Sequence, residues 1–263
     1  MLAIIGYILA IFVGLSIGII GAGGSILALP ILVYLFGIEA AETAPAYSLF
    51  IVAVSSLFGS YMKNKQGLIN FKLVWSFGIP TVIAIFVTRY FVVPAIPNEV
   101  FIIEQFVVTK RLLVMGMFSV LMIIASFYMM QQNKSEKPVK VNALLNYSGG
   151  FATGFLTGFV GAGGGFMLVP ALIKIGNLGV KAAVATSMLI IAINTSVGFT
   201  ASISHVTIDW MLLLTFSGLA VSGIFIGNSL SKKVNATQLK KGFGWFILLT
   251  GLFILINELF LKQ

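Results

Sequence analysis

The sequence predicts an all-α polytopic membrane protein built from two duplicated halves. Three observations support this fold class: an apolar composition, a series of helix-length apolar stretches, and a glycine-rich motif that occurs twice. The chain has 263 residues, of which 59% are hydrophobic and 9% charged, and its mean hydropathy is +1.09. Because soluble domains carry about 25% charged residues, this composition excludes an ordinary soluble domain.

Apolar stretches follow one another along the whole chain. Residues 1–38 and 141–173 contain no charged side chain, and each run exceeds the roughly 20 residues that cross a bilayer. The stretches lie at about 2–37, 43–62, 69–93, 109–131, 143–175, 180–203, 208–230 and 239–261. We expect about eight to ten membrane helices from them, because each of the two longest stretches has room for a full and a short element.

A motif of closely spaced glycines occurs in both of the longest stretches. Residues 14–30 read GLSIGIIGAGGSILALP and residues 154–170 read GFLTGFVGAGGGFMLVP, with seven of seventeen positions identical. When the halves are aligned beyond the motif, further identical pairs are Ala46/Ala185, Ser48/Ser187, Ile51/Ile190, Ala53/Ala192, Gly59/Gly198, Ile69/Ile208 and Leu73/Leu212. The chain is therefore duplicated. We assign residues 1–131 to a first transmembrane repeat, 132–142 to a polar linker and 143–263 to a second repeat.

The distribution of lysines predicts how the two repeats are oriented. Lysines in the 63–68 loop, in the central linker and in the 231–241 loop indicate that all three segments are cytoplasmic. Three apolar stretches separate the linker from the 231–241 loop, and they return the chain to the same side only if 143–175 is broken at its glycines. We therefore expect an inverted repeat, each half starting with a glycine-broken helix pair. Hydropathy alone favours eight helices and parallel halves.

The dense glycine clusters predict a binding site for an anion. Three glycines in four residues disrupt a helix, and broken helices occur at membrane depth where the backbone lines a polar cavity or is buried in protein. The N-terminus of a half-helix carries N–H groups and positive partial charge that attract anions. We expect half-helices to begin at Ser25 and Gly165 and to run on to Pro30 and Pro170. The candidate residues are Gly21, Gly23, Gly24, Ser25, Gly161, Gly163, Gly164 and Gly165.

A structural role remains the alternative for all of these glycines. The clusters would then be kinks without a ligand. The wider pairs Gly14/Gly18 and Gly154/Gly158 are small-xxx-small patterns, which allow two helix backbones to approach closely, and we favour that interpretation for them.

Small polar residues in the stretches after each motif predict the rest of the site. Ser48 and Ser55 are seven residues apart, as are Ser187 and Asn194, so each pair shares one helix face. A neutral hydrogen-bonding face beside a half-helix N-terminus suits an oxyanion. The alternative is that the hydroxyls join helices to one another. The candidates are Tyr47, Ser48, Thr186, Ser187 and Asn194.

Charged residues inside the apolar stretches are few. Arg89 and Lys174 lie near the ends of stretches, where we expect their head groups to reach the membrane surface. Asn70 and Asp209 begin stretches and are expected to be helix caps or interfacial residues, and Glu258 is expected to be interfacial. The chain has no cysteine, so we expect no disulfide or thiolate metal site. We expect no catalytic residue, no metal and no cofactor. We also expect no nucleic-acid partner, because membrane topology explains the net charge of +9.

The paired motifs resemble those of a known family. GIIGAGGS at 18–25 and GFVGAGGG at 158–165, each followed by a proline, resemble the sulfite exporter TauE/SafE family of bacterial and plant permeases. The A-x-S stretches and the basic central linker are similar as well, so the resemblance covers essentially the whole chain. It implies export of small sulfur-containing anions such as sulfite or sulfonates. Ser25, where the second copy has Gly165, departs from exact symmetry.

Together these features predict a secondary transporter, more specifically an exporter, of small sulfur oxyanions. The anion would bind near the midplane to backbone amides, with the lipid bilayer as the other partner and with no signal for an oligomeric state. The alternatives are an anion channel or a permease for a non-sulfur anion. A serine protease is disfavoured because the sole histidine, His205, lies in a short loop that we expect to be solvated. A scaffold protein would not need two broken helix pairs.

Overall fold

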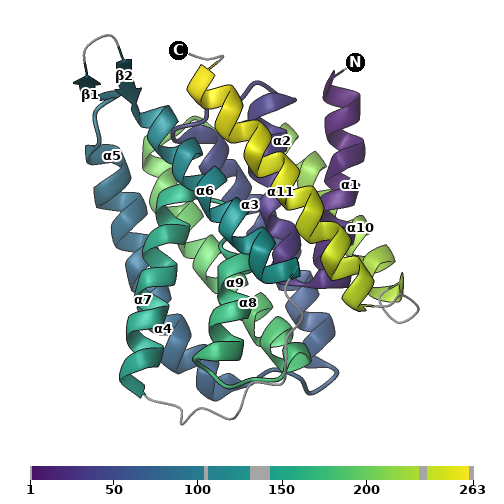
Figure 1. The fold of residues 1–263 in the computed structure, drawn as a ribbon. Helices are drawn as coiled ribbons and strands as arrows, with labels where there is room; N and C mark the ends of the chain where they lie inside the picture. Colours follow the sequence, from purple (N-terminus) through teal and green to yellow (C-terminus); the bar gives the residue numbers. More distant parts are fainter. Residues whose placement is uncertain (1, 104–105, 131–142, 231–235, 261–263) are drawn as a thin grey trace.

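The computed structural model describes residues 2–103, 106–130, 143–230 and 236–260, and the described chain is almost entirely helical (Figure 1). The first half consists of α1 (Leu2–Ile20), the 3₁₀-helix η1 (Ala22–Leu27), α2 (Ala28–Tyr34), α3 (Thr43–Asn64), α4 (Phe71–Val87), the π-helix η2 (Thr88–Val92), α5 (Val93–Ala95), β1 (Glu99–Ile103), β2 (Phe106–Thr109) and α6 (Lys110–Met130). The second half consists of α7 (Ala143–Val160), α8 (Gly165–Lys174), α9 (Val180–Ser202), the 3₁₀-helix η3 (Ile203–His205), α10 (Trp210–Leu230) and α11 (Ala236–Phe260).

The helices have the length and the surface of membrane spans. Within the described ranges, 5 helices are long and apolar enough to cross a bilayer: Thr43–Asn64, Phe71–Ala95, Lys110–Phe127, Val180–His205 and Trp210–Leu230. Large apolar side chains such as Trp75, Leu214 and Phe253 are more than half exposed, which suits contact with lipid. The chain is therefore an integral, multi-pass membrane protein, as the sequence predicts.

Polar side chains at the ends of the stretches cap the helices. The Asn70 side chain accepts a hydrogen bond from the Leu73 N–H at 3.1 Å, and Asp209 Oδ1 accepts one from the Leu212 N–H at 3.1 Å. The predicted capping roles of both residues are confirmed. Capping matters here because the first N–H groups of a helix have no partner within it.

Equivalent helices of the two halves lie side by side and run antiparallel. Tyr47, near the start of α3, donates a hydrogen bond to the Thr207 carbonyl just after α9, whereas Gly59, toward the end of α3, lies against Met188 near the start of α9. Gly251 of α11 likewise lies beside the middle of α6. The repeat is therefore inverted, and α1 and α7 enter the bundle from opposite ends (Figure 1).

The remaining helices pair across the repeat through their glycines. A Cβ atom on Gly14 would overlap the backbone of Ala220 in α10, and one on Gly154 would overlap the backbone of Thr81 in α4. Thr81 and Ala220 are themselves equivalent, in the alignment that pairs Ser48 with Ser187. The helix-packing interpretation of these wider glycine pairs agrees with the structure, because only glycine permits backbones to approach so closely.

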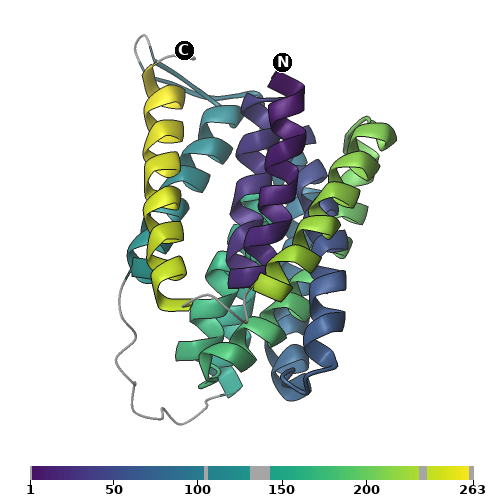
Figure 2. The ribbon, with the colours of Figure 1, turned by 90° about the vertical axis from the view of Figure 1, so that its right-hand side faces the viewer.

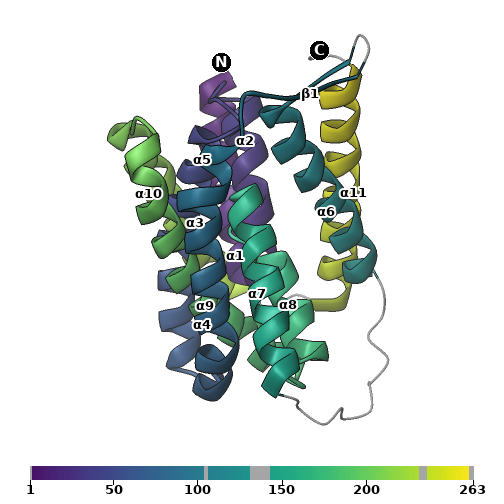
Figure 3. The ribbon, with the colours of Figure 1, turned by 90° about the vertical axis from the view of Figure 1, so that its left-hand side faces the viewer.

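Helices α6 and α11 form a pair that stands beside the rest of the bundle (Figures 2 and 3). Arg111 donates two hydrogen bonds to the Glu258 carboxylate, both of 2.9 Å, and the Tyr34 hydroxyl of α2 donates a third of 2.9 Å. Glu258 is only 3% exposed although it lies near the end of α11, so its carboxylate is covered by protein. The two bonds from Arg111 hold α6 to α11, and the bond from Tyr34 joins this pair to α2; together the three compensate the burial of the carboxylate.

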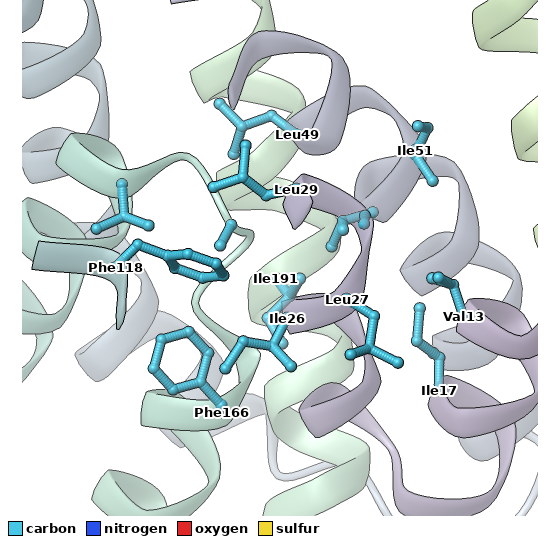
Figure 4. Close-up of a cluster of buried hydrophobic side chains, with 14 of the residues drawn as sticks. Val13, Ile17, Ile26, Leu27, Leu29, Leu49, Ile51, Phe118, Phe166 and Ile191 are labelled. Carbon is cyan, nitrogen blue, oxygen red and sulfur yellow. The ribbon is translucent and has the colours of Figure 1, made fainter. Parts of the chain in front are cut away.

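The centre of the molecule is apolar where the two broken segments cross. Ile26 of η1 and Phe166 of α8 occupy equivalent positions of the two motifs, and both are buried in one cluster with Phe118 and Ile191 (Figure 4). A small antiparallel hairpin, β1–β2, lies at the same end of the bundle as the start of α1 and the end of α11 (Figure 1). This hairpin was not predicted from the sequence, although EVFII and FVVT are rich in β-branched and aromatic residues.

Candidate functional site

The second glycine cluster breaks the chain between α7 and α8. Gly161, Gly163 and Gly164 have φ angles of 74°, 72° and 62°, in the left-handed region that costs other residues about 1–2 kcal/mol. The helix α8 then begins at Gly165, so the predicted start of this half-helix is confirmed. It continues past Pro170 to Lys174 and is 10 residues long.

The first glycine cluster has a different local structure. Gly21 has a φ of 84°, but the chain then enters the 3₁₀-helix η1 at Ala22 and becomes α-helical only at Ala28. The expectation that a half-helix begins at Ser25 is therefore wrong. Gly23 and Gly24 lie inside η1, and Ser25 is 1% exposed. Only the second copy places the start of an α-helix directly after the break.

The break lies level with the middle of α3, beside a row of serines. A Cβ on Gly163 would come within 2.6 Å of Val52, which lies in the middle of α3. Ser48 and Ser55 are one turn from Val52 in either direction and share its face of the helix. Both hydroxyls are buried and have no hydrogen-bond partner among the described residues. Ser48 was predicted for the site, and Ser55 only as a residue on the same face.

Two further polar groups contact the break directly. A Cβ on Gly164 would overlap the Thr157 hydroxyl, and one on Gly161 would overlap the Arg89 guanidinium. Thr157 Oγ1 and both Arg89 Nε and Nη2 are buried and lack a hydrogen-bond partner in the described part of the chain. Such unsatisfied buried groups are uncommon in proteins and often mark a site that holds a ligand or water.

Arg89 is 2% exposed, so the expectation that it reaches the membrane surface is wrong. It belongs to η2, a single π-helical turn between α4 and the short α5, and such turns occur frequently at functional sites. Glu42, Ser202 and His205 line a small cavity together with Arg89. His205 is exposed, as expected for a loop residue, and Glu42 forms an ion pair with Lys110.

Three predicted site residues have hydroxyls that are already hydrogen-bonded. Tyr47 donates to the Thr207 carbonyl at 3.0 Å and accepts from the Asp209 N–H, Thr186 accepts from the Asn70 N–H at 2.9 Å, and Ser187 donates to the Val184 carbonyl at 2.9 Å. Tyr47 and Thr186 thereby connect the two halves of the chain. A ligand would have to compete with these bonds.

Asn194 lies in a different environment. Both atoms of its side-chain amide are buried without a partner in the described chain. It lines a groove of about 220 Å³ between α4 and α9, whose other walls are apolar residues such as Trp75, Ile79 and Ile193. None of the glycines of the break lines this groove, so the groove does not group Asn194 with them.

The sequence analysis did not assign Arg89 and Thr157 to the site. A signal existed for Arg89, since an ionisable residue inside an apolar stretch marks a functional candidate. Thr157 stands inside the second motif where the first copy has Ile17, and that difference between the copies was a second signal. In the ranges that the structure covers, no group of three or more His, Cys, Asp or Glu residues is arranged to bind a metal.

Comparisons with known proteins agree with this architecture. Residues 6–254 match the model of the family described as sulfite exporter TauE/SafE. A probable membrane transporter protein of Xylella fastidiosa is 24% identical over 92% of this chain and 91% of its own length. One of Methanocaldococcus jannaschii is 26% identical over 94% and 95%, and the probable membrane transporter protein YjnA of Bacillus subtilis is 26% identical over 93% and 96%. No solved structure matches significantly. The chain belongs to the sulfite exporter TauE/SafE family.

Proposed function

We propose that this membrane transporter carries small sulfur oxyanions, such as sulfite or sulfonates, as an exporter, and that the anion binds at the break between α7 and α8. One observation carries the proposal: the N-terminus of α8 lies level with the middle of α3, among buried polar atoms that have no protein partner in the described chain. Unpaired N–H groups and positive partial charge at a half-helix N-terminus favour an anion.

Each group around the break has a part in this proposal. The backbones of Gly163, Gly164 and Gly165 offer N–H groups without a side chain that would keep the ligand away. The Gly161 N–H already donates to the Thr157 carbonyl at 2.8 Å, so Gly161 would line the site by leaving room beside the Arg89 guanidinium. Ser48 offers a hydroxyl from the facing helix. The anion would also pass through the first motif and along α3 and α9. The residues lining that path would be Gly21, Gly23, Gly24, Ser25, Tyr47, Thr186, Ser187 and Asn194. For Tyr47, Thr186 and Ser187 this requires that their present hydrogen bonds open.

The sulfur chemistry is inferred from the family, whereas the geometry favours small oxyanions in general. Hydroxyl and N–H donors bind sulfonate, sulfite and carboxylate oxygens alike. No redox or acid–base step is needed for such transport, so we propose no enzymatic activity. An anion channel would use the same groups, and saturation of the transport rate separates the two.

We further propose that the lysine-rich end of the bundle faces the cytoplasm, with the linker at 132–142 on that side and the second repeat running from 143 to 263. Lys63, Lys65, Lys72, Lys174 and Lys181 lie where α3 and α8 end and α4 and α9 begin. The described carboxylates, Glu39, Glu42, Glu99, Asp209 and Glu258, all lie at the opposite end. This asymmetry follows the positive-inside rule for a bacterial cytoplasmic membrane.

Introduced cysteines can test which end of the bundle faces the cytoplasm, because the natural chain has no cysteine. Lys65 and Asn98 are exposed and lie at opposite ends of the α4 segment. In intact cells, an impermeant maleimide should label Asn98→Cys and leave Lys65→Cys unlabelled until the membrane is opened. The reverse pattern would contradict the proposed orientation, and labelling of both in intact cells would do so as well.

The substrate is tested by efflux from proteoliposomes with a set membrane potential. Sulfite and methanesulfonate should move with saturable kinetics, and acetate and nitrate serve as controls. A membrane potential drives one elementary charge with about 2.3 kcal/mol per 100 mV, so a monoanion needs no coupling ion. Movement of acetate or nitrate alone would refute the sulfur assignment, and non-saturable movement would favour the channel.

A further inference from the structure

We propose that Arg89 supplies the positive charge that binds the transported anion, and that the site at the α7–α8 break takes a single monoanion in preference to a dianion. This inference deepens the proposed function and rests on it. It concerns a residue that no sequence motif of the chain points to as a ligand-binding group.

The burial of Arg89 is the first argument. Its side chain is 2% exposed, its guanidinium lies against Gly161, and its Nε and Nη2 have no hydrogen-bond partner within the described ranges. A buried cation is costly unless another charge compensates it. A guanidinium presents several donors in a rigid plane, and it is well suited to the oxygens of an anion. The unused donors therefore point to a ligand beside Gly161.

The count of charges around the cavity is the second argument. Arg89 shares the cavity with Glu42 and with the exposed His205, and Glu42 forms an ion pair with Lys110. One carboxylate thus faces two cations, Arg89 and Lys110, and one positive charge remains uncompensated. A bound monoanion makes the cluster neutral, whereas a dianion leaves a negative charge inside the protein. The balance therefore favours a singly charged ligand.

The pseudo-symmetry of the fold shows whether helix packing alone requires an arginine at this position, because the other half of the chain has an equivalent position. In the alignment that pairs Thr81 with Ala220, Arg89 corresponds to Asn228 of α10. The surrounding contacts are equivalent: Gly158 lies against Ile85 and Thr88, and Gly18 lies against Ile224 and Gly227. The helix pairing therefore forms with an asparagine at this position, and packing alone does not require an arginine.

The second end of the bundle carries its cation differently. Lys63, which corresponds to Ser202, donates a hydrogen bond of 3.3 Å to the Asn228 side chain. Ser202 itself lines the cavity of Arg89. Each end thus has one cation and one neutral residue in equivalent places, with the cation on η2 at one end and on α3 at the other. A double variant can therefore remove the cation at Arg89 and place one at Ser202 instead, so that the cavity keeps a positive charge.

The groups beside Arg89 complete a binding site. The Thr157 hydroxyl lies against Gly164, buried and without a partner in the described chain, and α8 begins at Gly165. An anion between Gly161 and Gly164 would accept hydrogen bonds from the guanidinium, from this hydroxyl and from the first N–H groups of α8. Bonds from a charged donor are about twice as strong as neutral ones, so Arg89 should dominate the affinity.

The test is isothermal titration calorimetry on the purified full-length protein in micelles, with methanesulfonate, sulfate, nitrate and acetate as probes. Wild-type protein should bind methanesulfonate more tightly than sulfate. Arg89→Asn, which introduces the residue of the equivalent position, should weaken the binding of methanesulfonate about 10- to 100-fold. Arg89→Lys, which keeps the charge, should stay within about tenfold of wild type. Unchanged affinity in Arg89→Asn, or tighter binding of sulfate than methanesulfonate in the wild type, would overturn the proposal.

A double variant keeps the test decisive if Arg89→Asn does not fold. Arg89→Asn/Ser202→Lys reproduces the pair of Asn228 and Lys63 and returns a cation to the same cavity. Methanesulfonate binding by this folded variant supports the charge assignment, whereas a folded variant without binding contradicts it. The probes also separate the two proposals. Nitrate or acetate binding that depends on Arg89, without sulfonate binding, refutes the sulfur function alone. Wild-type protein that binds none of the four anions refutes both.

Discussion

Substitution of Gly161 by alanine tests the geometry of the break most directly. Gly161 has a φ of 74°, so an alanine there costs about 1–2 kcal/mol of backbone strain. Its Cβ would also overlap the Arg89 guanidinium and the Pro45 side chain, and such overpacking costs typically about 1–3 kcal/mol more. We therefore expect Gly161→Ala to lower the free energy of unfolding by about 2–5 kcal/mol and to abolish anion transport.

Gly37 provides the matched control for this substitution. Its φ is 68°, but no atom lies within 4 Å of a Cβ built on it, so Gly37→Ala carries the backbone strain without the overlap. We expect that variant to lose about 1–2 kcal/mol and to keep its transport rate. The assays are unfolding by denaturant in mixed micelles and efflux from proteoliposomes. Equal destabilisation of the two variants, together with wild-type transport by Gly161→Ala, would refute the placement of Arg89 against the break.

Two further substitutions test how the bundle is held together. Gly14→Leu should disrupt the pairing of α1 and α10, because a Cβ at this position already overlaps the backbone of Ala220. Gly218→Leu, on the open face of α10, should be tolerated. Comparable yields of the two folded variants in size-exclusion chromatography would contradict this prediction. Glu258→Gln removes the charge that accepts two hydrogen bonds from Arg111, and because Arg111 is 31% exposed we expect a loss of only about 1–3 kcal/mol in the same denaturant assay. Unchanged stability would mean that the ion pair does not hold α6 and α11 together.

Much of the fold was predictable because its signals are local. The length of the apolar stretches predicts the spans, and the lysines predict their direction without any knowledge of packing. The start of α8 at Gly165 was predictable for a similar reason, since the positive φ angles at Gly163 and Gly164 suit only glycine. The same argument failed at Ser25, where η1 continues through the residue. A 3₁₀-helix follows the break at Gly21, and an α-helix follows the break at residues 161–164, although both clusters share the sequence GAGG. Contacts with neighbouring segments therefore select between the two conformations.

The candidate site was predictable in outline. Ser48 and the second glycine cluster lie together, whereas the hydroxyls of Tyr47, Thr186 and Ser187 are hydrogen-bonded within the protein. A sequence specifies which residues carry a donor and which share a helix face. It does not specify whether a neighbouring helix already offers an acceptor, because that depends on contacts between segments from different halves of the chain.

By itself, the sequence determined the membrane class, the duplication and the position of the second break, since these follow from local composition and from the conformational range of glycine. The lysines favoured inverted halves and hydropathy favoured parallel ones, and the contacts between α3 and α9 decided between the two. The tertiary structure alone decided the environment of Arg89. An arginine near the end of an apolar stretch either extends to the membrane surface or turns inward, and both choices have the same local sequence. The pairing of α4 with α7 buries it against Gly161, because the glycines of α7 allow the two backbones to approach closely enough to exclude water.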